Sequence, residues 1–209
     1  MKRLFDVCLS PIFLILLAPL LVLTAILILI DLGSPVIFRQ RRAGRDGQVF
    51  EIIKFRTMRD GEGTDAERVT RLGHWLRLTS IDELPELVNV LLGEMSLVGP
   101  RPHMVAGTNR YSRRQMARLS VRPGMTGLAQ VNGRNAISHD RKIALDLAYI
   151  RDHSLWLDLQ IMAKTIPVVL LRAGRDKAAG DALCPSMLWP DFSRWSSALV
   201  LFRMARSSG

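Results

Sequence analysis

The feature that most constrains this chain is an uncharged apolar segment close to its N-terminus. From Val7 to Ile30, 24 consecutive residues carry no charge. As a helix this segment would be about 36 Å long, enough to cross a bilayer core of about 30 Å. A cleaved signal peptide fits poorly, because the apolar region is too long and no small-x-small cleavage site follows it. The segment therefore predicts a helix that resides in a membrane.

Prolines and flanking charges argue against a plain transmembrane anchor. Pro19 lies near the middle of the segment and Pro11 near its start, and a proline inside a helix removes a hydrogen bond and kinks it. Basic residues lie on both flanks, which is awkward for a crossing helix because Lys and Arg collect on the cytoplasmic side. These residues are Lys2, Arg3, Arg39, Arg41, Arg42 and Arg45. We therefore expect a kinked re-entrant helix over residues 1–31, with a spanning helix as the alternative.

The charge balance indicates an anionic partner. The net charge is +10 and the pI is about 10.7, which suits nucleic acid, an acidic membrane surface or a phosphorylated substrate. Only 6% of the residues are aromatic and no zinc-finger, homeodomain or RNA-recognition signature is present. We therefore expect no nucleic acid and instead a phospholipid bilayer. The two cysteines, Cys8 and Cys184, predict neither a disulfide framework nor a metal site.

A β-hairpin is predicted directly after the apolar segment. Residues 36–38 and 49–53 have strand character, and Gly44 to Gly47 supplies the turn. From Arg39 to Arg59 the chain carries seven basic and two acidic residues, and the hairpin-tip arginines suit lipid headgroups. Lys54 and Arg56 are two residues apart and so lie on one side of an extended chain. That arrangement favours binding of a phosphate.

The stretch from Thr79 to Pro102 carries the candidate chemistry. Ser80 followed by Glu83 reads as a capping box, which predicts a helix start with Asp82 and Glu83 in its first turn. There the free backbone N–H groups and the helix dipole favour negative charge. Acidic first turns are common, so this pair alone is weak evidence for catalysis. It gains weight from the Gly99–Pro102 turn, in which two prolines fix one arginine between them.

A second loop is rich in glycine. Residues 122–135 contain three glycines and a proline, with Arg122 and Arg134 among them. A glycine-rich loop by itself is a weak sign of phosphate binding, but with these two cations it predicts an anion-binding segment. Residues 141–171 read as one or two helices, with Tyr149 and Trp156 suited to a core or to a membrane interface. Residues 173–209 carry no motif.

These separated motifs, in this order, resemble the bacterial sugar transferases, which are small monotopic phosphoglycosyl transferases. The resemblance covers residues 2 to about 171. It is strongest at residues 54–58, 79–102 and 122–135, and at Tyr149, Ser154, Trp156 and Asp158. It implies a mainly α fold with a small β-hairpin, an α+β monotopic membrane protein. Its parts would be the re-entrant helix 1–31, a catalytic domain 32–172 at the cytoplasmic face of the bacterial inner membrane, and a divergent tail 173–209.

The resemblance also implies the reaction and its residues. A phosphosugar would pass from a UDP-sugar to polyprenyl phosphate, with Mg²⁺ as cofactor, as the first membrane step of polysaccharide or glycoconjugate assembly. Asp82 would be the nucleophile, with Glu83 beside it, and both would bind the metal. A covalent aspartyl intermediate spares the two anionic substrates a direct encounter. The implied substrate-binding residues are Lys54, Arg56, Pro100, Arg101, Pro102, Arg122, Gln130 and Arg134.

The sequence departs from the family pattern at two positions, and two other functions or topologies remain compatible with it. Ala18 stands where the family usually has serine before the helix-breaking proline, and Leu128 stands where it usually has tryptophan. Charge and anchor alone also fit a membrane-anchored basic binding protein without catalysis, and a spanning enzyme would share the same chemistry. The sequence identifies neither the UDP-sugar nor the oligomeric state, and a homo-oligomer is compatible with it.

Overall fold

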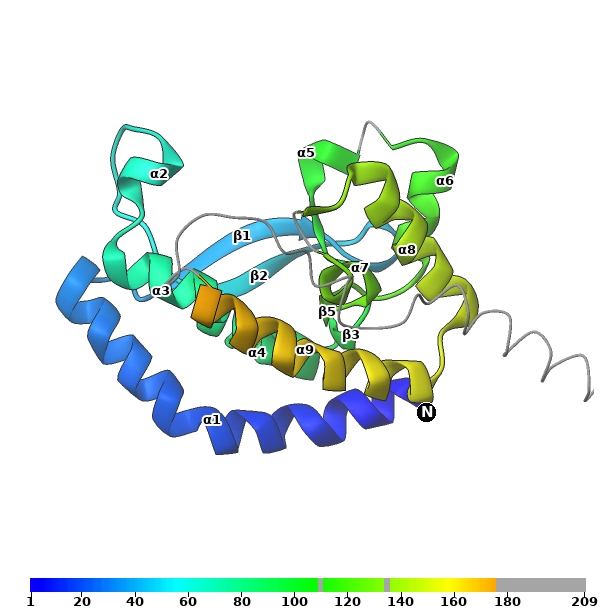
Figure 1. Ribbon diagram of the computed structural model, residues 1–209, viewed down its shortest axis with the longest axis horizontal. Helices are drawn as coiled ribbons and strands as arrows, with labels where there is room; N and C mark the ends of the chain where they lie inside the picture. The colour runs from blue at the N-terminus through cyan, green and yellow to red at the C-terminus, as the bar shows by residue number, and fades with distance from the viewer. Residues whose placement is uncertain (109–110, 134–135, 176–209) are drawn as a thin grey trace, which may run out of the picture.

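The computed structural model describes residues 1–108, 111–133 and 136–175 (Figure 1). Arg134 and nearly all of the predicted tail 173–209 lie outside these ranges. The fold is mostly helical with small sheets, as predicted. The helices are α1 (Lys2–Leu32), α2 (Asp65–Arg68), α3 (Arg71–Thr79), α4 (Glu86–Leu92), α5 (Val105–Thr108), α6 (Arg113–Met116), α7 (Leu128–Val131), α8 (His139–Asp152) and α9 (Leu155–Arg175). Short 3₁₀ turns are η1 (Arg45–Gly47), η2 (Ile81–Glu83) and η3 (Ala117–Ser120).

The predicted β-hairpin is confirmed. Strands β1 (Ile37–Ala43) and β2 (Val49–Phe55) pair antiparallel, with Ile37 opposite Phe55 and Ala43 opposite Val49. The turn between them is η1, where Asp46 takes a left-handed conformation (φ 54°). A short strand, β4 (His103–Met104), pairs with the other edge of β1. The hairpin therefore brings the segment after the Gly99–Pro102 turn beside the basic strands.

The second sheet explains the glycines that the sequence assigned to anion binding. Strands β3 (Ser96–Val98) and β5 (Gly124–Thr126) pair in parallel. The Gly99 amide donates to the Thr126 carbonyl at 2.8 Å, and the Gly124 amide donates to the Pro100 carbonyl at 2.9 Å. A Cβ atom on Gly124 would lie 2.0 Å from the Gly99 nitrogen. Glycine is thus required here for a close approach of two backbone segments.

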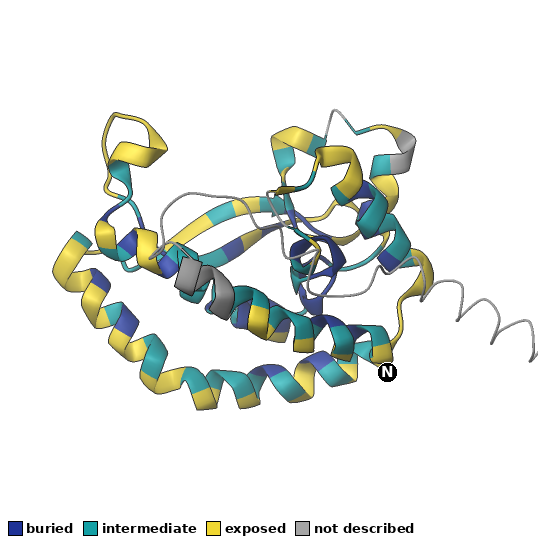
Figure 2. Cartoon of the chain, in the orientation of Figure 1, coloured by how far each residue is buried: buried dark blue, intermediate teal, exposed yellow. Residues whose placement is uncertain are grey.

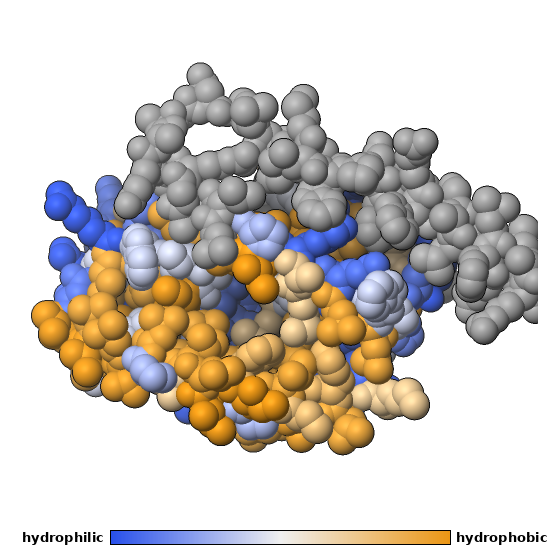
Figure 3. Space-filling model, turned by 60° about the horizontal axis from the view of Figure 1, so that its bottom comes forward, coloured by the Kyte–Doolittle hydropathy of each residue, from blue (hydrophilic) through white to orange (hydrophobic). Residues whose placement is uncertain are grey.

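The long apolar helix is confirmed. Helix α1 runs without interruption from Lys2 to Leu32, with both prolines inside it, and curves along one face of the molecule (Figure 1). By length and composition it could cross a membrane, and few residues of its most apolar part are buried. Figures 2 and 3 show this exposed apolar surface. Its largest contributors include Ile15, Leu16 and Ile30.

The N-terminal end of α1 is tied to the rest of the chain by polar contacts. Lys2 forms an ion pair with Asp158, which is 1% exposed. Arg3 donates to the carbonyl oxygen of Leu91 at the end of α4, at 2.8 Å. The Asp6 carboxylate accepts hydrogen bonds from the Ser96 hydroxyl and from a backbone amide of β3, each at 3.1 Å. Three charged side chains thus fix this end of α1 against α4, β3 and α9.

The C-terminal end of α1 is bound to the same body. The Arg56 guanidinium, directly after β2, donates to the carbonyl oxygens of Leu32, Gly33 and Ser34. The last carbonyls of a helix lack partners within it, and a cation placed there satisfies them. Between the two ends, Ile28 of α1 packs with Phe55 and Leu76 in a small core cluster. Both ends of an apolar helix are therefore held by one domain.

The main core lies between α4, β2, β3, α7, α8 and α9. Its buried residues are Phe50, Ile52, Leu87, Val90, Met95, Leu97, Val98, Leu128, Tyr149 and Ile161. Within it, the Tyr149 hydroxyl bonds to the Asp158 carboxylate at 2.7 Å. Of the two aromatic residues considered for a membrane interface, Tyr149 lies in this core, whereas Trp156 is 68% exposed.

The close pairing of β3 with β5 generates a prediction about stability. Gly124→Ala would force a methyl group against the backbone of Gly99, and we expect a loss of unfolding free energy of about 3 kcal/mol. The matched control is Gly107→Ala, since a Cβ atom there meets nothing within 4 Å. Urea unfolding of the detergent-solubilised protein measures both. Equal stabilities of the two variants would contradict the role given to Gly124.

Candidate active site

Asp82 and Glu83 lie in a short 3₁₀ turn, and not in the first turn of the apolar α-helix as the sequence predicted. Ser80 takes a left-handed conformation (φ 56°) that ends α3, and Asp82 and Glu83 follow in the 3₁₀ turn η2. Helix α4 starts only at Glu86, after Pro85. The capping-box prediction is wrong because Ser80, in its left-handed conformation, ends α3 and its side chain does not cap the turn that follows.

This turn lies on the wall of a large cavity. The cavity has a volume of about 780 Å³ and is lined by residues of the hairpin, of η2, of the segment around Arg101, and of α7 and α8. Its charged lining includes Lys54, Arg77, Asp82 and Glu83. Cavities that bind small molecules or cofactors usually measure about 300–1,000 Å³. The space thus suits a ligand of nucleotide size.

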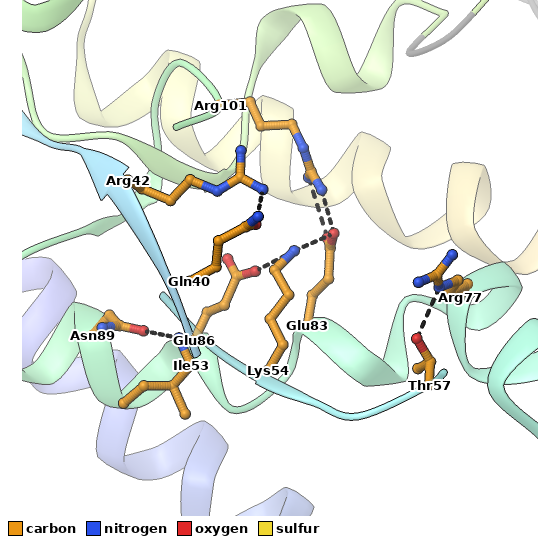
Figure 4. Close-up of polar contacts among 10 residues, drawn as sticks. All are labelled: Gln40, Arg42, Ile53, Lys54, Thr57, Arg77, Glu83, Glu86, Asn89 and Arg101. Carbon is orange, nitrogen blue, oxygen red and sulfur yellow. Dashed lines mark hydrogen bonds and ion pairs between the residues drawn. The ribbon is translucent and has the colours of Figure 1, made fainter. Parts of the chain in front are cut away.

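Glu83 is the centre of an ion-pair network (Figure 4). Lys54 from β2 places its Nζ 3.0 Å from Glu83 Oε1. Arg101 approaches with both terminal nitrogens, one of them 3.3 Å from Glu83 Oε2. Burial alone would raise the pKa of Glu83, but Arg101 and Lys54 together outweigh burial and hold this pKa well below its usual range. Glu83 is therefore a permanent anion that positions two cations.

Glu86 shares Lys54 with Glu83, and the sequence analysis did not identify it. Its Oε1 lies 3.0 Å from Lys54 Nζ, and the residue is 2% exposed. Burial raises the pKa of Glu86, and the negative charge of Glu83 adds to this effect, against the opposing influence of Lys54. The spacing of three residues between Glu83 and Glu86 could have indicated that the two side chains lie close together.

An asparagine fixes the strand that carries Lys54. Asn89, 0% exposed, donates to the Glu51 carbonyl at 2.7 Å. It also accepts from the Ile53 amide at 3.0 Å (Figure 4). These contacts attach β2 to α4. Because Lys54 directly follows Ile53, the position of the lysine depends on this attachment.

Asp82 has a different environment from Glu83. It is 8% exposed, and its Oδ1 has no hydrogen-bond partner among the described residues. Burial and the neighbouring charge of Glu83 raise the pKa of Asp82 to about 6, although Lys54, Arg77 and Arg101 act in the opposite direction. A desolvated carboxylate with a free oxygen, facing a cavity lined with cations, is equipped to attack an electrophile that those cations bind.

The structure places the other predicted substrate-binding residues unequally. Arg56 lines the cavity, but its guanidinium bonds to the end of α1 and lies 3.2 Å from the Asp60 carboxylate. Pro100 and Pro102 are buried on either side of Arg101. Arg122 donates to the Gly93 carbonyl at 2.7 Å and is not among the residues that line the cavity. Gln130 lines the cavity and is buried, whereas Arg134 lies outside the described residues.

A buried ion pair in the cavity wall also escaped the sequence analysis. Arg118 of η3 bonds to Asp146 of α8, and both residues are at most 5% exposed. They are 28 residues apart, and neither belongs to a motif, so no sequence signal joins them. Burial lowers the pKa of the nearby His103 to about 4, and Arg118 adds to this effect.

Comparison with known proteins gives a consistent result. The family model described as bacterial sugar transferase matches residues 1–172. The chain is 43% identical over 180 residues to the uncharacterized sugar transferase EpsL of Bacillus subtilis. The match covers 83% of this chain and 89% of EpsL. It is 46% identical over 185 residues to the UDP-glucose:undecaprenyl-phosphate glucose-1-phosphate transferase of Caulobacter vibrioides. That match covers 81% of this chain and 69% of the Caulobacter protein. The Escherichia coli protein of the same name is 41% identical, and the match covers only 39% of its length.

The burial of Asp82 generates a prediction about pH and stability. Its pKa is 3.8 in the reference state and about 6 in the folded protein, so between these values the folded state binds more protons than the unfolded state. Stability should therefore fall as pH rises through this window. Asp82→Asn cannot ionise and should lose this dependence, a difference of up to about 3 kcal/mol between pH 4 and pH 7.5.

Urea unfolding at a series of pH values measures this effect. The matched control is Asp46→Asn at the exposed hairpin tip, whose side chain is 65% exposed, and which should follow the wild type. Parallel stability curves for wild type and Asp82→Asn would show that Asp82 keeps an ordinary pKa.

Proposed function

Because this chain belongs to the bacterial sugar transferase family, we propose that it transfers a sugar 1-phosphate from a UDP-sugar to undecaprenyl phosphate and so initiates polysaccharide biosynthesis. The names of the relatives from Caulobacter vibrioides and Escherichia coli support this activity. The observation that carries the proposal is the pairing of two unlike carboxylates on one cavity wall. Asp82 has a free oxygen and a raised pKa, whereas Glu83 is held as an anion by Lys54 and Arg101.

In the first step, an Asp82 carboxylate oxygen attacks the sugar-proximal phosphorus of the UDP-sugar. A bond forms between this oxygen and phosphorus, the bond from phosphorus to the bridging oxygen breaks, and UMP leaves with the electron pair. Lys54 and Arg101 line the cavity beside Asp82 and can bind the diphosphate oxygens, arginine through two parallel hydrogen bonds. Glu83 orients both cations before the substrate arrives.

In the second step, a phosphate oxygen of undecaprenyl phosphate attacks the same phosphorus. The bond to Asp82 breaks, the carboxylate is regenerated, and the product is a lipid diphosphate that carries the sugar. Dividing the transfer in this way keeps the two anionic substrates from meeting directly. The basic lining of the cavity offsets the charge of each in turn.

The residues present fit a magnesium ion that is shared with the substrate. No group of three or more histidine, cysteine, aspartate or glutamate side chains suited to a metal occurs in the described part of the chain. Mg²⁺ commonly binds through one or two carboxylates, with phosphates and water completing its shell. Asp82 Oδ1 is free for this purpose, whereas Glu83 could join only by loosening its contacts with Lys54 or Arg101. Bound there, the ion would neutralise charge on the leaving group.

We also propose that α1 is re-entrant and that the catalytic domain lies on the cytoplasmic face of the bacterial inner membrane. The support is that both ends of α1 bond to one domain, through Lys2, Arg3 and Asp6 at one end and Arg56 at the other. A helix that crossed the bilayer would break one of these sets. Leu92 and Trp156, exposed on α4 and α9, add apolar surface suited to the interface.

The covalent step is tested by mass spectrometry. Incubation with Mg²⁺ and UDP-glucose or UDP-galactose, without lipid acceptor, should add one phosphosugar to the peptide that contains Asp82. Asp82→Asn should show no adduct and a loss of transfer of roughly 10⁴-fold or more, because an amide cannot form the phosphoanhydride. An adduct on Glu83, or full transfer by Asp82→Asn, would overturn the assignment. Failure of every UDP-sugar to release UMP would favour a binding protein instead.

The topology is tested by cysteine labelling in intact cells. In a background with Cys8 and Cys184 replaced by alanine, a single cysteine is placed either ahead of Met1 or at Arg45, which is exposed at the hairpin tip. A reagent that cannot cross the inner membrane should label neither site until the cells are opened. Labelling of one site in intact cells would establish a spanning helix.

A further inference from the structure

An aromatic side chain lies exposed on the wall of the cavity that contains Asp82 and Glu83. Phe38 of β1 lines this cavity and is 45% exposed. It belongs to neither of the two core clusters formed by the described residues, whereas its neighbour Ile37 packs against the small cluster at α1. Single exposed apolar residues are common on protein surfaces, but this one faces a cavity with a charged lining. The ring is not needed for the core and is available to a ligand.

The pairing of the hairpin strands places Phe38 beside the lysine of the ion-pair network. Phe38 is opposite Lys54 in the antiparallel pair of β1 and β2. Side chains of opposite residues lie on the same face of a sheet, with Cβ atoms about 4.5–5.5 Å apart. Lys54 bonds to Glu83, the neighbour of Asp82. The apolar ring is therefore next to a cation that can bind a phosphate, close to the proposed nucleophile.

Phe38 also lies at the end of the cavity that adjoins the apolar helix. Val36, two residues earlier, packs against the small core cluster at α1, and its carbonyl accepts from the Arg56 amide at 2.8 Å. The Arg56 guanidinium bonds to the last carbonyl oxygens of α1. Along β1, the residues that line the cavity are Phe38, Gln40 and Arg42. This face of the strand thus changes from apolar to cationic with distance from α1.

The two substrates differ in what is bonded to their phosphate groups. In undecaprenyl phosphate an isoprene unit follows the phosphate directly, so that an anion and an apolar chain adjoin. In a UDP-sugar the neighbours of the diphosphate are two rings that carry hydroxyl groups, and the base lies beyond the ribose. A cation binds the phosphate and an aromatic ring gains from covering an apolar chain. The adjacent side chains of Lys54 and Phe38 therefore match the lipid substrate.

We propose that Phe38 binds the first isoprene units of undecaprenyl phosphate while Lys54 binds its phosphate, so that the lipid enters the cavity at the end beside the C-terminus of α1. This inference rests on the proposed function, because it takes a polyprenyl phosphate as the acceptor. It makes Phe38 a binding residue for the second step, separate from the groups that receive the UDP-sugar in the first.

The experiment measures the two substrates separately. When a transfer passes through a covalent intermediate, kcat/KM for each substrate reports on its own step. With the full chain in lipid nanodiscs, Phe38→Ala should lower kcat/KM for undecaprenyl phosphate about 10-fold, which corresponds to about 1.4 kcal/mol, because an apolar contact is lost. The value for UDP-glucose should stay that of the wild type. The matched control is Val49→Ala, at an apolar residue of the same hairpin that is 44% exposed and is not among the residues lining the cavity; it should change neither value.

A soluble competitor distinguishes contact with the lipid chain from contact with the bilayer. Geranyl phosphate carries only the first two isoprene units, and its inhibition constant against undecaprenyl phosphate is measured in detergent. Phe38→Ala should raise this constant by a factor similar to the loss in kcat/KM. If geranyl phosphate does not compete in the wild type, or inhibits both proteins equally, the ring does not bind the start of the chain and the inference is overturned. Weaker binding of the variant to vesicles would then make Phe38 a bilayer anchor.

The remaining outcomes separate this inference from the proposed function. A lower kcat/KM for UDP-glucose alone would assign the ring to the sugar or the base, and equal losses for both substrates would assign it to the shape of the cavity. Either result overturns the inference while the wild type still forms the adduct on Asp82. If the wild type forms no adduct and releases no UMP, the proposed function itself fails. If Phe38→Ala does not fold, Phe38→Leu keeps an apolar side chain and Phe38→Thr suits a strand but is polar; equal kcat/KM values of these two variants for the lipid would contradict the proposal.

Discussion

The Glu83 carboxylate contacts side chains from two other segments, Lys54 of β2 and Arg101 after β3, and these contacts hold the cavity wall together. Glu83 joins the hairpin through Lys54 and the turn after β3 through Arg101, while its own turn joins α3 to α4. Paired charges removed from water stabilise a structure only when each has good partners, and the loss of one partner leaves an unpaired buried charge. The two neighbouring acids therefore differ in their contacts. Both Glu83 oxygens bond to Lys54 or Arg101, whereas Asp82 Oδ1 has no hydrogen-bond partner among the described residues.

The apolar helix and the polar cavity are built as one unit. Lys2 bonds to Asp158, and Asp158 also accepts from Tyr149 in the main core. The N-terminal end of α1 is therefore continuous with the residues that form the centre of the domain. The apolar helix and the domain that contains the cavity are therefore fixed to each other directly.

Local patterns could be read from the sequence, whereas contacts between distant residues could not. The apolar run predicted α1, and the Gly44–Gly47 turn between two short strands predicted the hairpin. The capping-box prediction at Ser80 failed because this residue ends α3 in a left-handed conformation and its side chain does not cap the turn that follows. The pairs Lys2–Asp158 and Arg118–Asp146 span 156 and 28 residues, and only the folded chain brings them together. The close pairing of β3 with β5 at Gly124 was not foreseen either, since composition does not reveal which glycine allows two backbones to approach.

The end of strand β2 connects the apolar helix α1 with the cavity. Lys54 faces Glu83 in the cavity, and Arg56 holds the last carbonyls of α1, with only Phe55 between them. Phe55 itself packs against Ile28 of the membrane helix. Any displacement of this end of α1 therefore acts directly on the end of β2. Three consecutive residues, 54 to 56, thus connect the apolar helix to the cavity wall.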